Sequence, residues 1–120
     1  MGLTHCKPLL RTLDVDQSIA FYTQLLGFTC VEHRPEWGWA CLRQNEIELM
    51  LALPNAHDPI AQTAFTGSLY FSTDAIEPLW ERLQGHAPVC YPLETFDWGM
   101  REFAIYDPNG YLLQFGQEIE

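Results

Sequence analysis

The sequence predicts an α+β fold built from two βαβββ modules, and two observations support this prediction. First, one order of expected elements, a strand, a helix and three further strands, occurs twice along the 120 residues. Second, a stretch rich in turn-forming residues, Pro54–Gly67, separates the two copies. Modules of this size cannot bury their apolar faces alone, so we expect the two modules of this single domain, residues 1–120, to pair, either within one chain or across two. We place module one at about 3–53, the linker at about 54–67 and module two at about 68–117.

Module one is expected to open with a strand at His5–Thr12 and to continue into a helix over residues 14–26. Asp14 or Asp16 can cap the start of this helix, and Gly27 supplies the left-handed conformation that ends it. The apolar side chains of the helix recur close to a 3.6-residue period: Ile19, Phe21, Tyr22, Leu25 and Leu26. Three strands are expected to follow, at Thr29–His33, Trp39–Arg43 and Ile47–Leu53.

Module two repeats this plan. A strand at Ser68–Thr73 precedes a helix over residues 74–84, in which Asp74 and Glu77 have the spacing of a capping box, and Gly85 ends the helix. Its apolar stripe consists of Ile76, Leu79, Trp80 and Leu83. The expected strands are Val89–Tyr91, Arg101–Tyr106 and Tyr111–Gly116.

The last two strands flank Asp107-Pro108-Asn109-Gly110, which predicts a hairpin turn. Pro108 presets φ for a type I turn, and the Asp107 side chain can accept backbone N–H groups. Gly110 tolerates the left-handed φ at which the chain re-enters the strand. The side chains after this turn alternate between the two faces of the sheet, which gives Gln114 a defined face.

Composition and charge limit the partners and the location that we expect for the protein. The net charge is −10, from 16 acidic and 6 basic residues. An acidic chain is a poor partner for nucleic acid or anionic membrane surfaces; it favours cationic or neutral ligands, or serves solubility alone. No apolar run reaches the roughly 18 residues of a membrane span, and no secretory signal is visible, so we expect a cytoplasmic protein. The four cysteines are scattered, which favours buried thiols over disulfides or zinc.

The chain also resembles a known family. Leu13-Asp14-Val15, Ser18–Tyr22 and Leu25–Phe28 resemble the opening of the vicinal-oxygen-chelate superfamily, which includes glyoxalase I and the bleomycin resistance proteins. Arg101–Ala104 and Asp107-Pro108 are similar to that superfamily's last hairpin. The resemblance implies two βαβββ modules that form a curved mixed sheet around a cleft, with helices on the outer face. It also implies a homodimer, because many members are dimeric.

Enzymes of this superfamily bind a divalent metal through four side chains that face the cleft, usually His or Glu. The resemblance places Lys7, Glu48, Ser68 and Gln114 at these positions. A charged ammonium has no lone pair to offer, and a hydroxyl and a carboxamide are poor ligands for such an ion. His5 shares a strand face with Lys7 and could replace it, but Ser68 and Gln114 would remain. We therefore predict no metal, no other cofactor and no catalytic residue.

The bleomycin-resistance branch sequesters its drug without altering it, and the chain resembles this branch most. Pro8 matches a proline associated with an exchanged N-terminal arm in the dimer, and Trp98-Gly99 matches a segment whose tryptophan lines the drug groove, although Met100 is inserted after it. Strand alternation and these matches give the expected ligand-binding residues: Trp37, Trp39, Glu46, Glu48, Ser68, Tyr70, Trp98 and Gln114. The expected ligand is a bleomycin-like or other planar, cationic compound, bound by stacking and cation–π attraction.

Three alternatives stay open at this point. The chain could be a divalent-metal-dependent lyase, isomerase or dioxygenase of the glyoxalase type. Glu48 could act as a lone general base in an apolar cleft, although a solvated or ion-paired carboxylate is the commoner arrangement, with Lys7 across the cleft as the candidate partner. A regulatory or interaction role is the third alternative.

Overall fold

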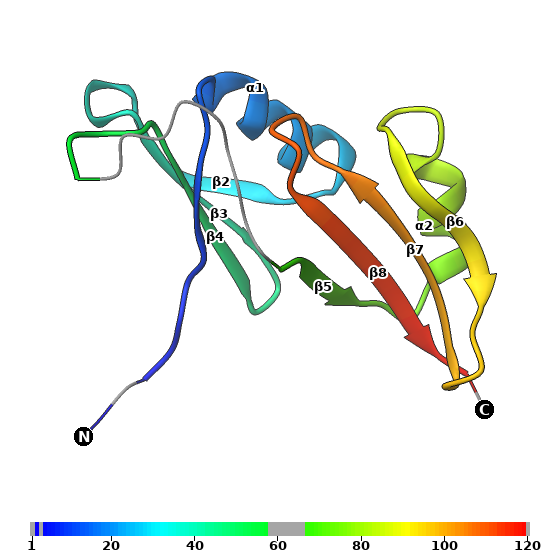
Figure 1. The fold of residues 1–120 in the computed structure, drawn as a ribbon. Helices are drawn as coiled ribbons and strands as arrows, with labels where there is room; N and C mark the ends of the chain where they lie inside the picture. Colours follow the sequence, from blue (N-terminus) through cyan, green and yellow to red (C-terminus); the bar gives the residue numbers. More distant parts are fainter. Residues whose placement is uncertain (1, 3, 58–66, 120) are drawn as a thin grey trace. The chain divides into compact units, whose positions relative to one another are not determined.

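The computed structural model describes residues 2, 4–57 and 67–119. The chain divides into two compact units, residues 1–62 and 63–120. Each unit holds one four-stranded mixed sheet, with strand orders β1-β4-β3-β2 and β5-β8-β7-β6 (Figure 1). In both, the first strand runs parallel to the fourth and the remaining neighbours are antiparallel. This repeated βαβββ order confirms the predicted α+β class; the expected linker lies largely outside the described residues.

The first unit follows the predicted order of elements. Its strands are β1 (Leu9–Arg11), β2 (Thr29–Arg34), β3 (Trp39–Gln44) and β4 (Ile47–Ala52), and its helical segments are α1 (Val15–Ala20), the π-helical η1 (Phe21–Leu25) and the short η2 (Pro35–Trp37). Of the two candidate caps, Asp14 is the one used, since its side chain accepts a hydrogen bond from the backbone N–H of Gln17 at 3.0 Å. Gly27 has φ 84°, which confirms the left-handed end of the helix.

Strand β1 is shorter than predicted because of Pro8. Its carbonyl accepts a hydrogen bond from the Met50 N–H at 2.8 Å, but proline has no N–H to return. The parallel ladder therefore begins only at Leu9, opposite Met50. The expected strand residues from His5 to Pro8 lie outside the ladder.

The second unit contains β5 (Leu69–Ser72), α2 (Ile76–Leu83), β6 (Val89–Thr95), β7 (Met100–Tyr106) and β8 (Leu112–Glu118). Its helix does not begin with the predicted capping box. Ala75 is the N-cap and makes no side-chain cap, while the backbone N–H of Ile76 donates to the Gln117 side chain of β8 at 2.9 Å. Because Gln117 satisfies this helix N-terminus from the sheet, Glu77 is free to pair with Arg101 of β7 instead.

The predicted hairpin turn forms as expected. One carboxylate oxygen of Asp107 accepts the N–H groups of Asn109 and Tyr111 at 2.8 and 2.9 Å, and Gly110 has φ 90°. Asp107 is itself buried, so these bonds satisfy a carboxylate that water cannot reach. The turn fixes the register with which β8 returns along β7.

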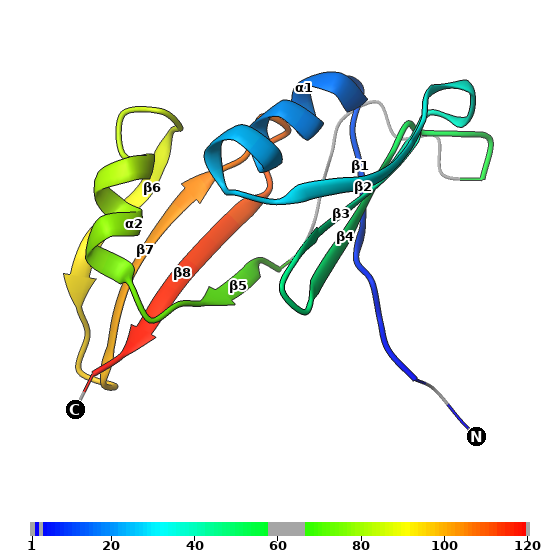
Figure 2. The same ribbon diagram turned by 180° about the vertical axis from the view of Figure 1, so that it is seen from behind.

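In each sheet one face packs against the unit's own helix (Figure 2). On that face Leu49, Leu51, Leu113 and Phe115 are buried, which confirms the predicted sorting of β4 and β8. Phe103 packs there against Trp80 of α2, with ring centroids 5.0 Å apart. The side chains that alternate with this core, including those at the predicted site positions 48 and 114, therefore lie on the face without a helix. Among the described residues, no helix combines the length and apolarity needed to cross a membrane.

Candidate functional site

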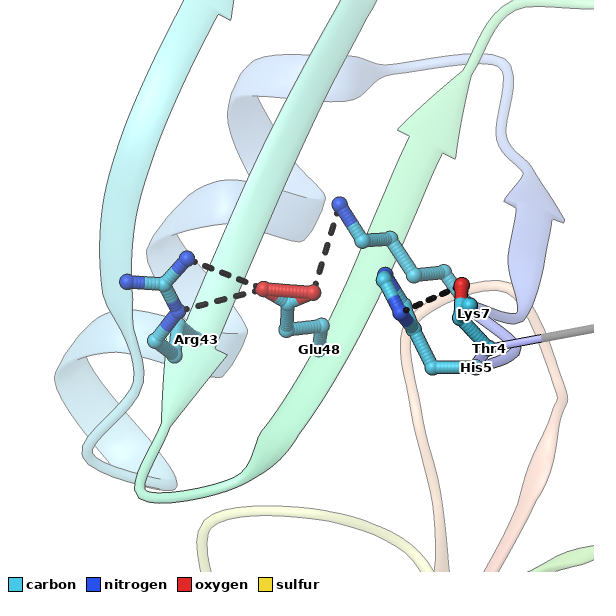
Figure 3. Close-up of polar contacts among 5 residues, drawn as sticks. All are labelled: Thr4, His5, Lys7, Arg43 and Glu48. Atoms are coloured by element: carbon cyan, nitrogen blue, oxygen red, sulfur yellow. Dashed lines mark hydrogen bonds and ion pairs between the residues drawn. The ribbon is translucent and has the colours of Figure 1, made fainter. Parts of the chain in front are cut away.

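In the first unit, Glu48 is held by two cations (Figure 3). The ammonium of Lys7 lies 3.2 Å from one carboxylate oxygen, which confirms the predicted ion pair. The guanidinium of Arg43 donates to the other oxygen at 2.9 and 3.2 Å, from the position directly opposite Glu48 on β3. The hydrogen bonds from Arg43 and then Lys7 hold the pKa of Glu48 below its ordinary value. Glu48 is thus an ionised, doubly paired carboxylate, not an available base.

Two other side chains from the predicted set lie apart from this ion triad. His5 is exposed, and its ring contacts the Thr4 hydroxyl at 3.4 Å, so Lys7 and not His5 occupies the position beside Glu48 (Figure 3). Glu46 is exposed in the turn before β4, where Asn45 has φ 54°.

In the second unit, Ser68 and Gln114 begin a chain of hydrogen bonds. The Ser68 hydroxyl donates to the carboxamide oxygen of Gln114, and the Gln114 amide donates to the Tyr91 hydroxyl at 2.9 Å. Tyr91 then donates to one carboxylate oxygen of Glu102 at 3.1 Å. The two positions carried over from the family's ligand set therefore satisfy each other, as Lys7 and Glu48 do in the first unit.

Glu102 gathers two further predicted residues. Its second carboxylate oxygen accepts the Tyr70 hydroxyl at 2.7 Å and the indole N–H of Trp98 at 3.4 Å. Only 6% of Glu102 is exposed. We call Ser68, Tyr70, Tyr91, Trp98, Glu102 and Gln114 the Glu102 network.

Tyr70 reaches Glu102 because Gly116 leaves room for it. β5 and β7 are separated by β8, so the ring must cross a whole strand. It passes over Gly116, where an added Cβ would lie 1.9 Å from the Tyr70 hydroxyl oxygen. Partial burial, followed by the bond to Glu102, raises the pKa of Tyr70 to about 12. The phenol is therefore a hydrogen-bond donor throughout the neutral range.

Trp98 is fixed on its other side by Phe96. Their rings stack with centroids 4.6 Å apart and 12° between planes, and Phe96 in turn meets the Tyr91 ring edge-on at 5.9 Å. The backbone turns tightly here, since the Gly99 N–H donates to the Phe96 carbonyl at 3.1 Å and the Phe96 N–H to the Met100 carbonyl at 2.8 Å. The inserted Met100 thus becomes the first residue of β7, and Trp98 still points toward Glu102.

The outer side of this cluster is open to solvent. Trp98 is 67% exposed and Tyr70 is 44% exposed. We call the surface formed by Tyr70, Phe96 and Trp98 the aromatic face. Exposed aromatic rings held by neighbouring contacts are suited to stack on a planar ligand.

The two other predicted tryptophans line a separate pocket within the first unit. Its volume is about 640 Å³, and Trp37 and Trp39 line it together with Glu32, Glu36 and Leu53. The Arg34 guanidinium lies 5.7 Å from the centre of the Trp37 ring and pairs with Glu32 at 2.8 Å. The pocket therefore combines aromatic walls with the carboxylates of Glu32 and Glu36, but Arg34 pairs with Glu32 and Arg11 also lines the pocket.

Sequence reasoning missed Glu102 and Tyr91. Alternation along β7 from the core residue Phe103 puts Glu102 on the face of Gln114, so that signal was present in the sequence. Tyr91 gave no such signal. The pairing of β6 with β7 shifts register once before Tyr91 and once after it, so simple alternation does not assign its face.

The donor set does not suit a divalent metal. Glu48 is bound by two cations, and Ser68 and Gln114 bind each other. Within residues 4–57 and 67–119, no three His, Cys, Asp or Glu side chains cluster as metal ligands would. All four cysteines are free, but only Cys41 is buried; Cys6 and Cys90 are exposed, contrary to the expectation of buried thiols.

Comparisons with known proteins agree with this architecture. A family model described as the Glyoxalase/Bleomycin resistance protein/Dioxygenase superfamily matches residues 2–115. Proteins named bleomycin resistance protein from Geobacillus stearothermophilus and Staphylococcus aureus are each 30% identical to the chain over 132 aligned residues, which cover 94% of this chain and 96% of the relative.

Solved structures share the fold. A protein of unknown function from Agrobacterium tumefaciens C58 aligns with a TM-score of 0.84 at 20% identity, covering 99% of this chain and 97% of its own. TioX from Micromonospora sp. ML1 aligns with a TM-score of 0.79 at 18% identity, covering 97% and 99%. Lactoylglutathione lyase from Agrobacterium tumefaciens aligns with a TM-score of 0.71 at 21% identity, covering 97% and 94%. These identities speak for the fold alone.

Proposed function

Since the chain belongs to the glyoxalase/bleomycin resistance protein/dioxygenase superfamily, we propose that it is a metal-free binding protein that sequesters a planar or cationic small molecule. One observation carries this proposal. The resemblance assigns Lys7, Glu48, Ser68 and Gln114 to the positions that hold the metal in enzymes of the superfamily. In this chain the four residues form two internal pairs, the Lys7–Glu48 ion pair and the Ser68–Gln114 hydrogen bond. A dication would have to displace both Lys7 and Arg43 from Glu48, and it would gain only neutral oxygens elsewhere.

Aromatic side chains support binding rather than catalysis. The aromatic face and the pocket lined by Trp37 and Trp39 both offer rings for stacking. The net charge of −10 adds a long-range attraction for cations. The homologues named bleomycin resistance protein make a bleomycin-type drug the first ligand to test, so the chain would act in antibiotic resistance.

We further propose that the protein is a cytoplasmic homodimer whose N-terminal arm is exchanged near Pro8. Residues 4–6 are exposed, whereas Lys7 is paired with Glu48 and the Pro8 carbonyl is bonded to β4, so the segment before Lys7 can reach a partner while Lys7 and β1 stay in place. The four free thiols fit a reducing compartment.

The test is a bleomycin titration followed by tryptophan fluorescence, with light scattering on the same sample to give the mass. We expect the drug to quench the tryptophan fluorescence of a dimer in a saturable way. In Trp98→Ala, both the amplitude of the quenching and the affinity for the drug should fall. The exposed Val31→Ala on β2 is a control that removes apolar surface from a residue that neither lines the Trp37 pocket nor belongs to the Glu102 network. Absence of quenching at high micromolar drug would reject bleomycin as the ligand.

A further inference from the structure

Glu102 is satisfied in an unusual way. It is a buried carboxylate that accepts three hydrogen bonds, from Tyr70, Tyr91 and Trp98, and all three donors are neutral aromatic side chains. Buried carboxylates in proteins are ordinarily paired with a cation, because hydrogen bonds from neutral groups stabilise the charge without cancelling it.

No cation neutralises this charge among residues 67–119. Arg101 is the next residue along β7, but it points to the opposite face of the sheet, where it binds Glu77 of α2 and Thr95. Arg82 is exposed on α2, on that same helix side. Asp107, the other buried carboxylate of this unit, organises a turn through backbone N–H groups, but Glu102 lies within β7 and supports no turn, so its cost in stability points to a functional reason.

The position of the charge supplies this reason. It lies at the polar edges of two rings of the aromatic face, 2.7 Å from the Tyr70 hydroxyl and 3.4 Å from the indole nitrogen of Trp98. A cation stacked on the exposed rings would interact with their electron-rich faces and with the nearby charge of Glu102. Water is excluded around the carboxylate, so its field is screened less than that of a surface acid.

We infer that Glu102 makes the aromatic face select cationic over neutral planar ligands. Its bond to the indole N–H, together with the stack on Phe96, also holds Trp98 in the orientation that presents its ring. This inference rests on the proposed function and adds the class of ligand: a flat aromatic ring system that carries a permanent positive charge.

The experiment compares two dyes with the same ring system, N-methylacridinium and acridine, at pH 8, where only the first is charged. Their affinities are measured by tryptophan quenching for the wild type and for Glu102→Gln, which keeps the shape of the side chain and one acceptor oxygen but removes its charge. We expect the wild type to prefer N-methylacridinium by about tenfold and the variant to lose most of that preference. Binding of neutral acridine should change little.

Glu81→Gln is the matched control. Glu81 is an exposed residue of α2, so this substitution removes the same unit of net charge from the helix side of the sheet, and it should leave the preference intact. Glu102→Met also removes the charge and has a side chain of similar length. It replaces Glu102→Gln in this test if the glutamine variant does not fold.

Each outcome has one meaning. Loss of the preference in both Glu102 variants but not in Glu81→Gln supports the inference. A preference that survives in the Glu102 variants, or equal binding of the two dyes by the wild type, overturns the inference and leaves the proposed function standing. Failure of the wild type to bind either dye contradicts the inference and counts against a planar ligand altogether.

Discussion

The two units have the same topology, yet they treat the carboxylate on their helix-free face in opposite ways. In the first unit, Glu48 is held by Lys7 and Arg43, whose side chains are partly exposed. In the second unit, Glu102 is buried and is held by three neutral donors. The difference teaches that one fold can carry a neutralised, solvated charge in one copy and an uncompensated, desolvated charge in the other. Only the second retains a strong field for a ligand.

The largest expected effect on stability separates these two carboxylates. Glu102→Ala leaves three donors without their acceptor and opens space next to the aromatic face, so we expect a loss of about 2 kcal/mol in the free energy of unfolding. Glu48→Ala should cost clearly less, because exposed ion pairs contribute little. Urea unfolding of both variants measures the difference.

The acid dependence of the Glu48 variant provides a second check on this comparison. The pKa of Glu48 is lowered in the folded state, so its contribution is present above the ordinary value of 4.5 and is lost as the pH falls below it. Wild type and Glu48→Ala should therefore converge in acid. If Glu48→Ala and Glu102→Ala lost the same free energy of unfolding at pH 7, the proposed contrast between the two units would be wrong.

A smaller effect is expected at Gly116, which sharpens the account of how Tyr70 reaches Glu102. Gly116→Ala places a methyl group where the Tyr70 hydroxyl lies, so the ring must swing away at a cost of about 1 kcal/mol. The displaced phenol should titrate nearer 10.0 than about 12, as followed by tyrosinate absorbance. Because the pKa of Tyr70 is raised in the folded state, its bond to Glu102 stabilises below pH 10 and is lost as the pH rises through about 12.

The control for Gly116→Ala is the same substitution in a Tyr70→Ala background. With the ring already gone, the added methyl group has no clash with it, and the extra loss of stability should vanish. An undiminished loss in this background would mean that Gly116 is needed for another reason.

Much of the fold could be predicted because it depends on local patterns. The helix that begins at the Asp14 cap, the glycine at 27 and the Asp107–Gly110 turn each have a local physical cause that the structure retains. The predicted 3.6-residue period holds only to Ala20, since Phe21–Leu25 is π-helical. The failures came from partners distant in sequence. Gln117 of β8 replaced the predicted capping box of α2, and the missing N–H of Pro8 shortened β1.

Individual residues of the site could also be predicted from the sequence, but their connections could not. The resemblance placed Lys7 and Glu48 in the same cleft, which suggested their ion pair, and the structure confirms that pair. Ser68, Tyr70, Trp98 and Gln114 were each expected on a ligand surface, but the sequence gave no reason to join them through one buried acid. That connection depends on Tyr70 crossing β8 at Gly116, which is a property of strand pairing rather than of any single segment.

The central claim is that the donor groups of this chain do not form a metal site, and metal content tests it most directly. Elemental analysis of the purified protein, after incubation with excess Ni²⁺, Zn²⁺, Mn²⁺ or Fe²⁺ and desalting, should find no stoichiometric metal. The Lys7 and Arg43 cations on Glu48 and the Ser68–Gln114 bond are the physical reasons. One equivalent of metal per chain in the wild type, absent from Glu48→Ala, would contradict the account and restore a glyoxalase-type enzyme in place of a binding protein.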